Sequence, residues 1–312
     1  GSAQGQTPHS NVDKSSTEHE ASYGFDILEP VDRPGQILVG AARRVEVIKL
    51  PEPARHPDNS WVVYEQPLNE RMRTFLRLDF LYSQALYHNE TSNVWSSRAA
   101  VASLLEILAI TARGDVRNEV LKELERQIHG LNVYQSKPGV DAGRLRAVLS
   151  NLMRLRNDLN GLGASYVQPL RDSEFLNAVK HRSAIPGGTC EFDLPDYFHW
   201  LNRAGDARIQ DFNDWLSLVR PLCDSIAELL WVIRANARQK RESAPGGVFQ
   251  INFERESPCQ LLRIALPEGS SLYPEISGSH YRCSARLLSW RDAFNRPTQA
   301  QDDVSFVLTC CY

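Results

Sequence analysis

The amino-acid sequence predicts an α+β fold, in which a mostly helical domain over residues 67–245 packs with a smaller antiparallel β domain over residues 246–312. Between residues 67 and 241 apolar side chains recur with helical spacing, and after Pro245 they alternate as in strands. A short β-prone segment, residues 61–66, precedes the helices. Because an isolated strand leaves its backbone groups unpaired, we expect residues 61–66 to join the C-terminal strands.

The composition is that of a globular protein, with 42% hydrophobic and 23% charged residues among 312. A net charge of −3 excludes a generally basic protein that coats nucleic acid. No apolar run approaches the ~18 residues of a membrane-spanning helix, and no secretory signal opens the chain. We therefore expect a cytoplasmic protein without membrane insertion. The six cysteines include no CxxC pair, which favours reduced, mostly buried thiols over a metal site.

Residues 1–60 differ in composition from the rest of the chain. They carry nine acidic and six basic residues, and this excess of three acids equals the net charge of the whole protein. Their polar composition and the five prolines between residues 30 and 57 predict a mostly disordered tail. Within it, Gln36–Leu50 could pair as a strand if it met a sheet edge.

The helical region carries start and stop signals in order along the chain. Pro67 is expected to open the first helix, and the second should begin after Asn93 and end at a left-handed Gly114. Aspartates suited to capping precede the next three apolar stripes, at Asp115, Asp141 and Asp172.

The last helices and the strands follow. A short helix is predicted around residues 195–201, and then a long helical stretch over 206–241 that Pro221 should kink or split. Alternating segments separated by turn residues predict four C-terminal strands: Val248–Phe253, Cys259–Leu266, His280–Ser289 and Asp303–Cys311.

Signals for an enzyme are weak. The sequence contains no GxGxxG, GxxxxGK[ST], GxSxG or HExxH motif, and its histidines are scattered without ligand spacing. Glu123 and Glu125 are two positions apart on a predicted helix, which favours solvated surface residues over an acid/base pair. We expect neither catalysis nor a cofactor.

The arginines of the strand over 280–289 are more informative. His280, Arg282, Ser284 and Arg286 share one face of this strand, and small or apolar residues share the other. Such charges can protect a sheet edge from aggregation, or they can bind the carboxylates of an acidic or C-terminal peptide. Nucleic acid is a further possible ligand. Two other basic groups lie at Arg234–Arg241, where they can offset a helix dipole, and at Lys180–Arg182.

Several longer blocks of the sequence carry a resemblance to a known family. They are EQPLNERMRTFLRLDFL at 65–81, RGDVR at 113–117, LKEL at 121–124, PGVD at 138–141, IPGG at 185–188, FDLP at 192–195, LYPEISG at 272–278 and the final Cys310-Cys311. Together these blocks resemble the ZapD family of bacterial cell-division proteins, in register over about residues 61–312. Residues 1–60 have no counterpart that we recognise in this family.

The resemblance implies a non-enzymatic homodimer that binds the C-terminal tail of FtsZ and cross-links FtsZ protofilaments at mid-cell. The family's basic β-domain pocket corresponds to Arg282 and Arg286, and the matching motif of the first helix also implicates Arg77. His280 is a further candidate on the same strand face. Apolar residues beside these side chains are expected to hold hydrophobic residues of the tail.

Overall fold

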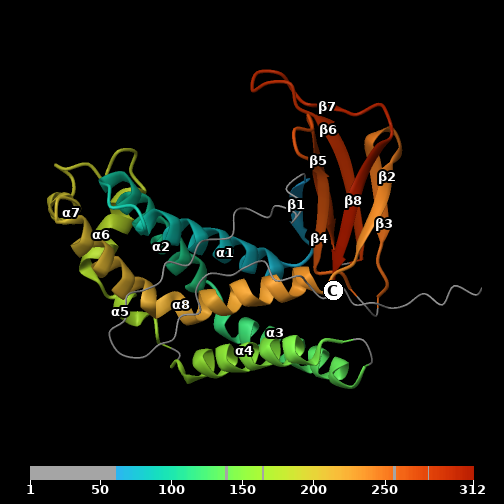
Figure 1. Cartoon of the computed structure of the whole chain (residues 1–312). Coiled ribbons are helices and arrows are strands. Elements are labelled where there is room, and N and C mark those ends of the chain that lie inside the picture. Colours follow the sequence, from blue (N-terminus) through green and yellow to red (C-terminus); the bar gives the residue numbers. More distant parts are fainter. Residues whose placement is uncertain (1–60, 138–139, 164, 256–257, 280) are drawn as a thin grey trace, which may run out of the picture.

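The computed structural model describes residues 61–312 except 138–139, 164, 256–257 and 280. The tail expected over residues 1–60, with its possible strand at Gln36–Leu50, therefore lies outside the described residues. Within them the α+β prediction is confirmed. Helices form one body, and two antiparallel sheets stand at one end of it (Figure 1).

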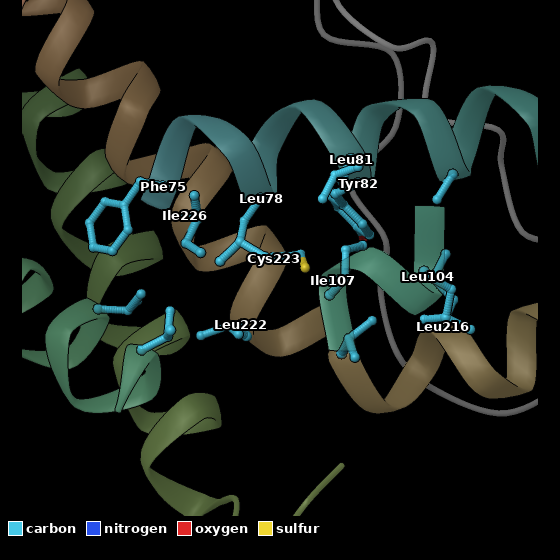
Figure 2. Packing of buried hydrophobic residues seen from close by; sticks show 14 of the residues in the cluster. Phe75, Leu78, Leu81, Tyr82, Leu104, Ile107, Leu216, Leu222, Cys223 and Ile226 are labelled. Carbon is cyan, nitrogen blue, oxygen red and sulfur yellow. The ribbon is translucent and has the colours of Figure 1, made fainter. Parts of the chain in front are cut away.

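The helical body is built around α1, α2 and α8, whose apolar faces meet in its core. Figure 2 shows Phe75, Leu78 and Tyr82 of α1 packed with Ile107 of α2 and Leu222 of α8. The helices are α1 (Glu70–Asn89), α2 (Val94–Thr111), α3 (Val116–Asn132), the 3-10 turn η1 (Val133–Ser136), α4 (Ala142–Gly161), α5 (Gln168–Arg171), α6 (Glu174–Ser183), α7 (Pro195–Leu201) and α8 (Gly205–Ala235).

Three of the predicted caps are confirmed, because the side chains of Asn93, Asp115 and Asp141 accept backbone N–H groups at the starts of α2, α3 and α4. Two predictions about helix starts are wrong. Pro67 ends a strand and Asn69 caps α1, since its side chain accepts the N–H of Met72 at 2.7 Å. Ser173 caps α6, because Asp172 is still part of the preceding turn.

Two helix ends also differ from expectation. Helix α2 ends at Thr111, and Gly114 is not among the described glycines with positive φ. Helix α8 is not split by Pro221, since its buried residues on both sides of the proline, such as Leu216 and Leu222, stay in one core. This helix stops at Ala235, and residues 239–244 pair as a strand instead of continuing it.

Helix α2 is long and apolar enough to cross a membrane, by length and composition alone, and it is the one such helix among the described residues. It packs against α1 and buries Val101, Leu104 and Ile107 in the helical core. Burial in the core therefore accounts for its composition.

The strands form two four-stranded sheets. Sheet A has the order β1 (Trp61–Pro67), β4 (Leu261–Pro267), β8 (Val304–Cys311), β2 (Gln239–Ala244). Sheet B has the order β3 (Val248–Asn252), β6 (Arg282–Ser289), β5 (Leu272–Ser279), and the short β7 (Thr298–Gln299) also pairs with β6.

The prediction that residues 61–66 join the C-terminal strands is confirmed, because β1 pairs antiparallel with β4. Strands β2, β5 and β7 were not predicted. Strand β5 contains Pro274 and Gly278, which disfavour a central strand, yet β5 is paired on one side only and an edge strand tolerates proline.

The two sheets pack face to face over a second hydrophobic cluster. Cys283, Ala285 and Leu287 of sheet B belong to it, and Phe249 and Phe306 meet across it with ring centroids 5.1 Å apart. The opposite side of sheet A contributes Leu261 and Cys311 to the helical core. The helices therefore meet sheet A at the end that carries the paired residues Leu261 and Cys311, and among the described residues sheet B contributes no buried residue to the helical core.

Ion pairs join the helices to sheet A. Arg234 near the end of α8 forms a two-point contact with Glu65 of β1, with N···O distances of 2.8 and 2.7 Å. Arg263 of β4 approaches the same carboxylate at 2.9 Å. These contacts fix the end of the long helix to the edge of the sandwich.

A second group of contacts between the helices and sheet A is centred on Glu123 of α3. The prediction that Glu123 is a solvated surface residue was wrong. The Glu123 side chain is fully buried, and it pairs with Arg126 and with Arg71 of α1, the latter at 3.0 Å. Arg71 also donates to Gln260, just before β4. The spacing of Glu123 and Glu125 excluded a facing pair but could not reveal that Glu123 lies on the buried side of α3.

Candidate functional site

The candidate site is the side of sheet B that faces away from sheet A, here called the outer face. Alternation along the strands defines it, because the neighbouring residues of each strand belong to the cluster between the sheets. The outer face consists of Tyr273, Glu275, Ser277 and Ser279 on β5, Arg282, Ser284, Arg286 and Leu288 on β6, and Val248, Gln250 and Asn252 on β3.

The predicted alternation of β6 is confirmed. Arg282 and Arg286 are exposed, whereas Cys283, Ala285 and Leu287 are buried against sheet A. The two arginines lie four residues apart along one strand, which separates their backbone positions by about 13 Å. An extended peptide could therefore contact both with side chains four positions apart.

Arg286 has a partner within the protein. It lies directly opposite Glu275 of β5, and its Nε donates to the Glu275 carboxylate at 3.1 Å while Nη2 donates to the same oxygen. Both side chains are more than half exposed, so water screens this pair. An incoming carboxylate would have to compete with Glu275 for Arg286.

Arg282 differs from Arg286 in this respect. Its cross-strand neighbours are Ser279 and Asn252, which are uncharged. Among the residues that the structure describes, no carboxylate forms an ion pair with Arg282. Within the described part of the chain, Arg282 thus keeps its guanidinium donors available for a bidentate ligand.

Apolar side chains lie on the Arg286 end of the outer face. Val248 is directly opposite Arg286 on β3, and Leu288 is directly opposite Tyr273 on β5. All three are partly exposed. The outer face therefore grades from polar near Arg282 to apolar near Leu288, which fits the expectation of apolar residues beside the arginines.

The loop between β6 and β7 continues this apolar end. Trp290 is 52% exposed and Phe294 is 98% exposed. Asp292 accepts the backbone N–H groups of Phe294 and Asn295 and the side-chain amide of Asn295, and these hydrogen bonds, the side-chain one foremost, lower the Asp292 pKa. The turn is thus held in one shape with Phe294 at its tip. The strand pattern gave no signal for this loop.

The remaining predicted site residues do not join the outer face through any described contact. Arg77 is exposed on α1, in the helical body, and α1 leads away from the sandwich (Figure 1). His280 lies outside the described residues. The structure therefore brings together Arg282 and Arg286 but leaves Arg77 as a separate exposed arginine.

Three members of the other two basic groups form ion pairs within the described part of the protein. Arg234 binds Glu65, Lys240 binds Glu242 at 2.6 Å, and Arg182 approaches Asp193 at 3.4 Å. For Arg234 the pairing is structural, since its side chain is three-quarters buried. These contacts favour a structural role for Arg234, whereas the side chains of Lys240 and Arg182 remain 75% and 46% exposed in their ion pairs.

Neither the thiols nor the carboxylates form a recognisable chemical centre in the described part of the chain. No group of three or more His, Cys, Asp or Glu side chains there is arranged to hold a metal ion. All six cysteines are free, and four of them are buried. Burial raises the pKa of Cys283 to about 11 and that of Cys311 to about 12, so these two thiols are poor nucleophiles at neutral pH.

Comparison with known proteins identifies the family. A family model described as "ZapD: Cell division protein" matches residues 76–286. The cell division protein ZapD of Methylococcus capsulatus is 40% identical over 250 residues, which cover 80% of this chain and 98% of that protein. The ZapD proteins of Dechloromonas aromatica and Janthinobacterium sp. are 33% and 34% identical over the same length, and the match covers 99% of each. The chain described here therefore belongs to the ZapD family of cell division proteins.

Proposed function

We propose that this protein is a non-catalytic partner of FtsZ that binds the C-terminal tail of FtsZ on the outer face of sheet B. As a homodimer it would cross-link FtsZ protofilaments into bundles and support the division ring at mid-cell. Membership of a cell-division family supports the role. The observation that carries the site is Arg282, exposed on a regular strand with no carboxylate partner among the described residues.

The chemistry of the outer face suits a short peptide that is both acidic and apolar. Arg282 supplies paired donors for a carboxylate, and Val248, Tyr273 and Leu288 supply partly exposed apolar surface beside Arg286. Each charged hydrogen bond contributes on the order of 1–3 kcal/mol. The affinity of a single site should therefore be moderate, and salt should weaken it because both partners are exposed.

A dimer can cross-link two filaments even when each site binds with moderate affinity. One protomer with one site can only decorate a filament, whereas a two-fold dimer presents two equivalent sites. Many weak links along two filaments then add up through avidity. In the part of the chain that the structure describes, sheet B contributes no buried residue to the helical core, so association through the helical body would leave both outer faces open.

Co-pelleting with FtsZ tests this function. Purified FtsZ is polymerised with GTP and centrifuged with and without this protein, at low and at high salt. We expect bundles that pellet at low salt and dissolve at high salt, and no bundles with FtsZ that lacks its C-terminal tail. Equal pelleting of full-length and truncated FtsZ would contradict binding to the tail.

A further inference from the structure

The outer face of sheet B is complementary to a segment of the same chain, which carries the opposite charge and is also partly apolar. Residues 25–32, here called the acidic segment, read Phe-Asp-Ile-Leu-Glu-Pro-Val-Asp. Asp26, Glu29 and Asp32 give it three carboxylates with no base among them, and Phe25, Ile27, Leu28 and Val31 make the rest largely apolar. The acidic segment thus offers carboxylates that can bind the arginines of the outer face and apolar side chains that can pack on Val248, Tyr273 and Leu288.

Residues 1–60, which include the acidic segment, differ in net charge from the rest of the chain. Residues 1–60 hold an excess of three acids, equal to the net charge of the whole protein, so residues 61–312 are neutral in sum. Against that neutral background the outer face and its adjoining loop hold Arg282, Arg286, Arg291 and Arg296 against Glu275 and Asp292. An acidic segment and a locally basic face in one chain attract each other.

The chain between the acidic segment and sheet B is long enough for the segment to contact the outer face. Residues 33–60 connect the acidic segment to the start of β1 at Trp61. Strand β1 lies at the edge of sheet A and also contacts β5 of sheet B. Stacked sheets are about 10 Å apart, whereas 28 connecting residues can span up to about 90 Å. The connection therefore reaches the outer face with length to spare.

We propose that the acidic segment binds the outer face of sheet B and competes there with the FtsZ tail. The inference rests on the proposed function in one respect, because it assigns both ligands to the same face. Covalent linkage supplies the segment at an effective concentration on the order of millimolar. A segment with an intrinsic Kd between about 0.1 and 1 mM would then occupy the face for half of the time or more. The acidic segment thereby lowers the apparent affinity of the outer face for the FtsZ tail.

A charge-neutralised variant of the full chain tests the competition. In Asp26→Asn, Glu29→Gln, Asp32→Asn the affinity for an FtsZ tail peptide should rise by about 2- to 10-fold, since the competitor is weakened. The matched control Asp13→Asn, Glu18→Gln, Glu20→Gln removes three carboxylates from the same part of the chain. It should leave the affinity unchanged. Equal affinities of both variants and the wild type would overturn the proposal, as would an equal rise in both variants.

A second measurement does not need FtsZ. A photoreactive benzoyl-phenylalanine replaces Phe25 in the full chain, and the cross-linked peptides are identified by mass spectrometry. We expect cross-links to β3, β5 or β6, and we expect the double substitution Arg282→Glu, Arg286→Glu to remove them. The same probe in place of Asn11 should not react with sheet B. Cross-links from Phe25 to the helices alone, or cross-links that persist in the double variant, would overturn the proposal.

The two measurements separate this inference from the proposed function. Cross-linking to sheet B without any binding of the FtsZ peptide would support the internal contact and refute the function. Binding of the peptide without cross-linking, and without the rise in affinity, would support the function and refute the internal contact.

Discussion

Two arginines on the same strand face have unequal surroundings. Arg286 pairs with Glu275, which lies directly opposite on β5, and Arg282 faces only Ser279 and Asn252 across its strands. A ligand gains the full contact with Arg282 but must displace Glu275 to reach Arg286. Glu275 is therefore expected to weaken the binding of any acidic peptide to this face.

Replacing Glu275 tests that expectation. Glu275→Gln removes the competing charge and keeps the size of the side chain, so the affinity for an FtsZ tail peptide should rise. Exposed pairs of this kind contribute about 0.2–1 kcal/mol, which corresponds to a rise of about 1.4- to 5-fold. Titration calorimetry at low salt measures it. The control Glu268→Gln changes an exposed glutamate in the turn after β4 and should have no effect. A weaker affinity in Glu275→Gln would contradict this account of Arg286.

At the residue scale, alternation predicted much of the candidate site. The strand period correctly placed Arg282 and Arg286 outside and Cys283 inside, because a half-buried strand must direct alternate residues to its core. It could not reveal Glu275 as the partner of Arg286, since pairing between strands depends on register. Register is set by the turn and the core, which the pattern of one strand does not contain.

At the scale of single elements, helix α3 connects the helical body to the sheets. Its buried Glu123 binds Arg71 of α1 and Arg126, and these arginines in turn contact Gln260 and the backbone carbonyl of Tyr312 at the end of β8. A buried carboxylate between two arginines is costly to remove, because the remaining charges lose their partner.

A pair of alanine substitutions on α3 measures this contribution. Glu123→Ala should lower the free energy of unfolding by about 3–5 kcal/mol. Glu125→Ala, two positions away on the exposed side of the same helix, should change it by less than about 0.5 kcal/mol. Chemical denaturation followed by circular dichroism compares the two. Equal effects would show that the Glu123 contacts do not stabilise the fold.

The elements themselves were predictable to different degrees. Helices with strong apolar stripes and polar caps, such as α2 behind Asn93 and α4 behind Asp141, followed from local chemistry. Strand β2 did not, because Gln239–Ala244 is polar and becomes a strand only by pairing with β8. Its structure depends on a partner that is distant in sequence, and propensity carries no information about such a partner.

At the scale of the whole molecule, the proposed function requires that one dimer carries two binding faces. Within the described residues sheet B contributes no buried residue to the helical core, so in a dimer joined through its helices each protomer would present its outer face. A dimer with one functional face should bind a filament but should not connect two filaments.

Mixed dimers test this requirement. A threefold excess of Arg282→Glu protein is equilibrated with a constant amount of wild type until subunits have exchanged. Random pairing then leaves about one quarter of the original wild-type dimers, so bundling should fall by about fourfold. Light scattering of FtsZ with GTP measures bundling, and a threefold addition of wild-type protein serves as the control. Undiminished bundling after verified exchange would contradict cross-linking by a dimer.

The most direct test of the account is the binding of an FtsZ C-terminal tail peptide to three full-length proteins. These are the wild type, Arg282→Glu, and the control Arg113→Glu, which reverses an exposed charge between α2 and α3. We predict that Arg282→Glu binds at least about tenfold more weakly, since a charged hydrogen bond is lost, while Arg113→Glu binds like the wild type. All three should have the same thermal unfolding curve. Equal affinity of Arg282→Glu and the wild type would contradict the assignment of the FtsZ site to the outer face of sheet B.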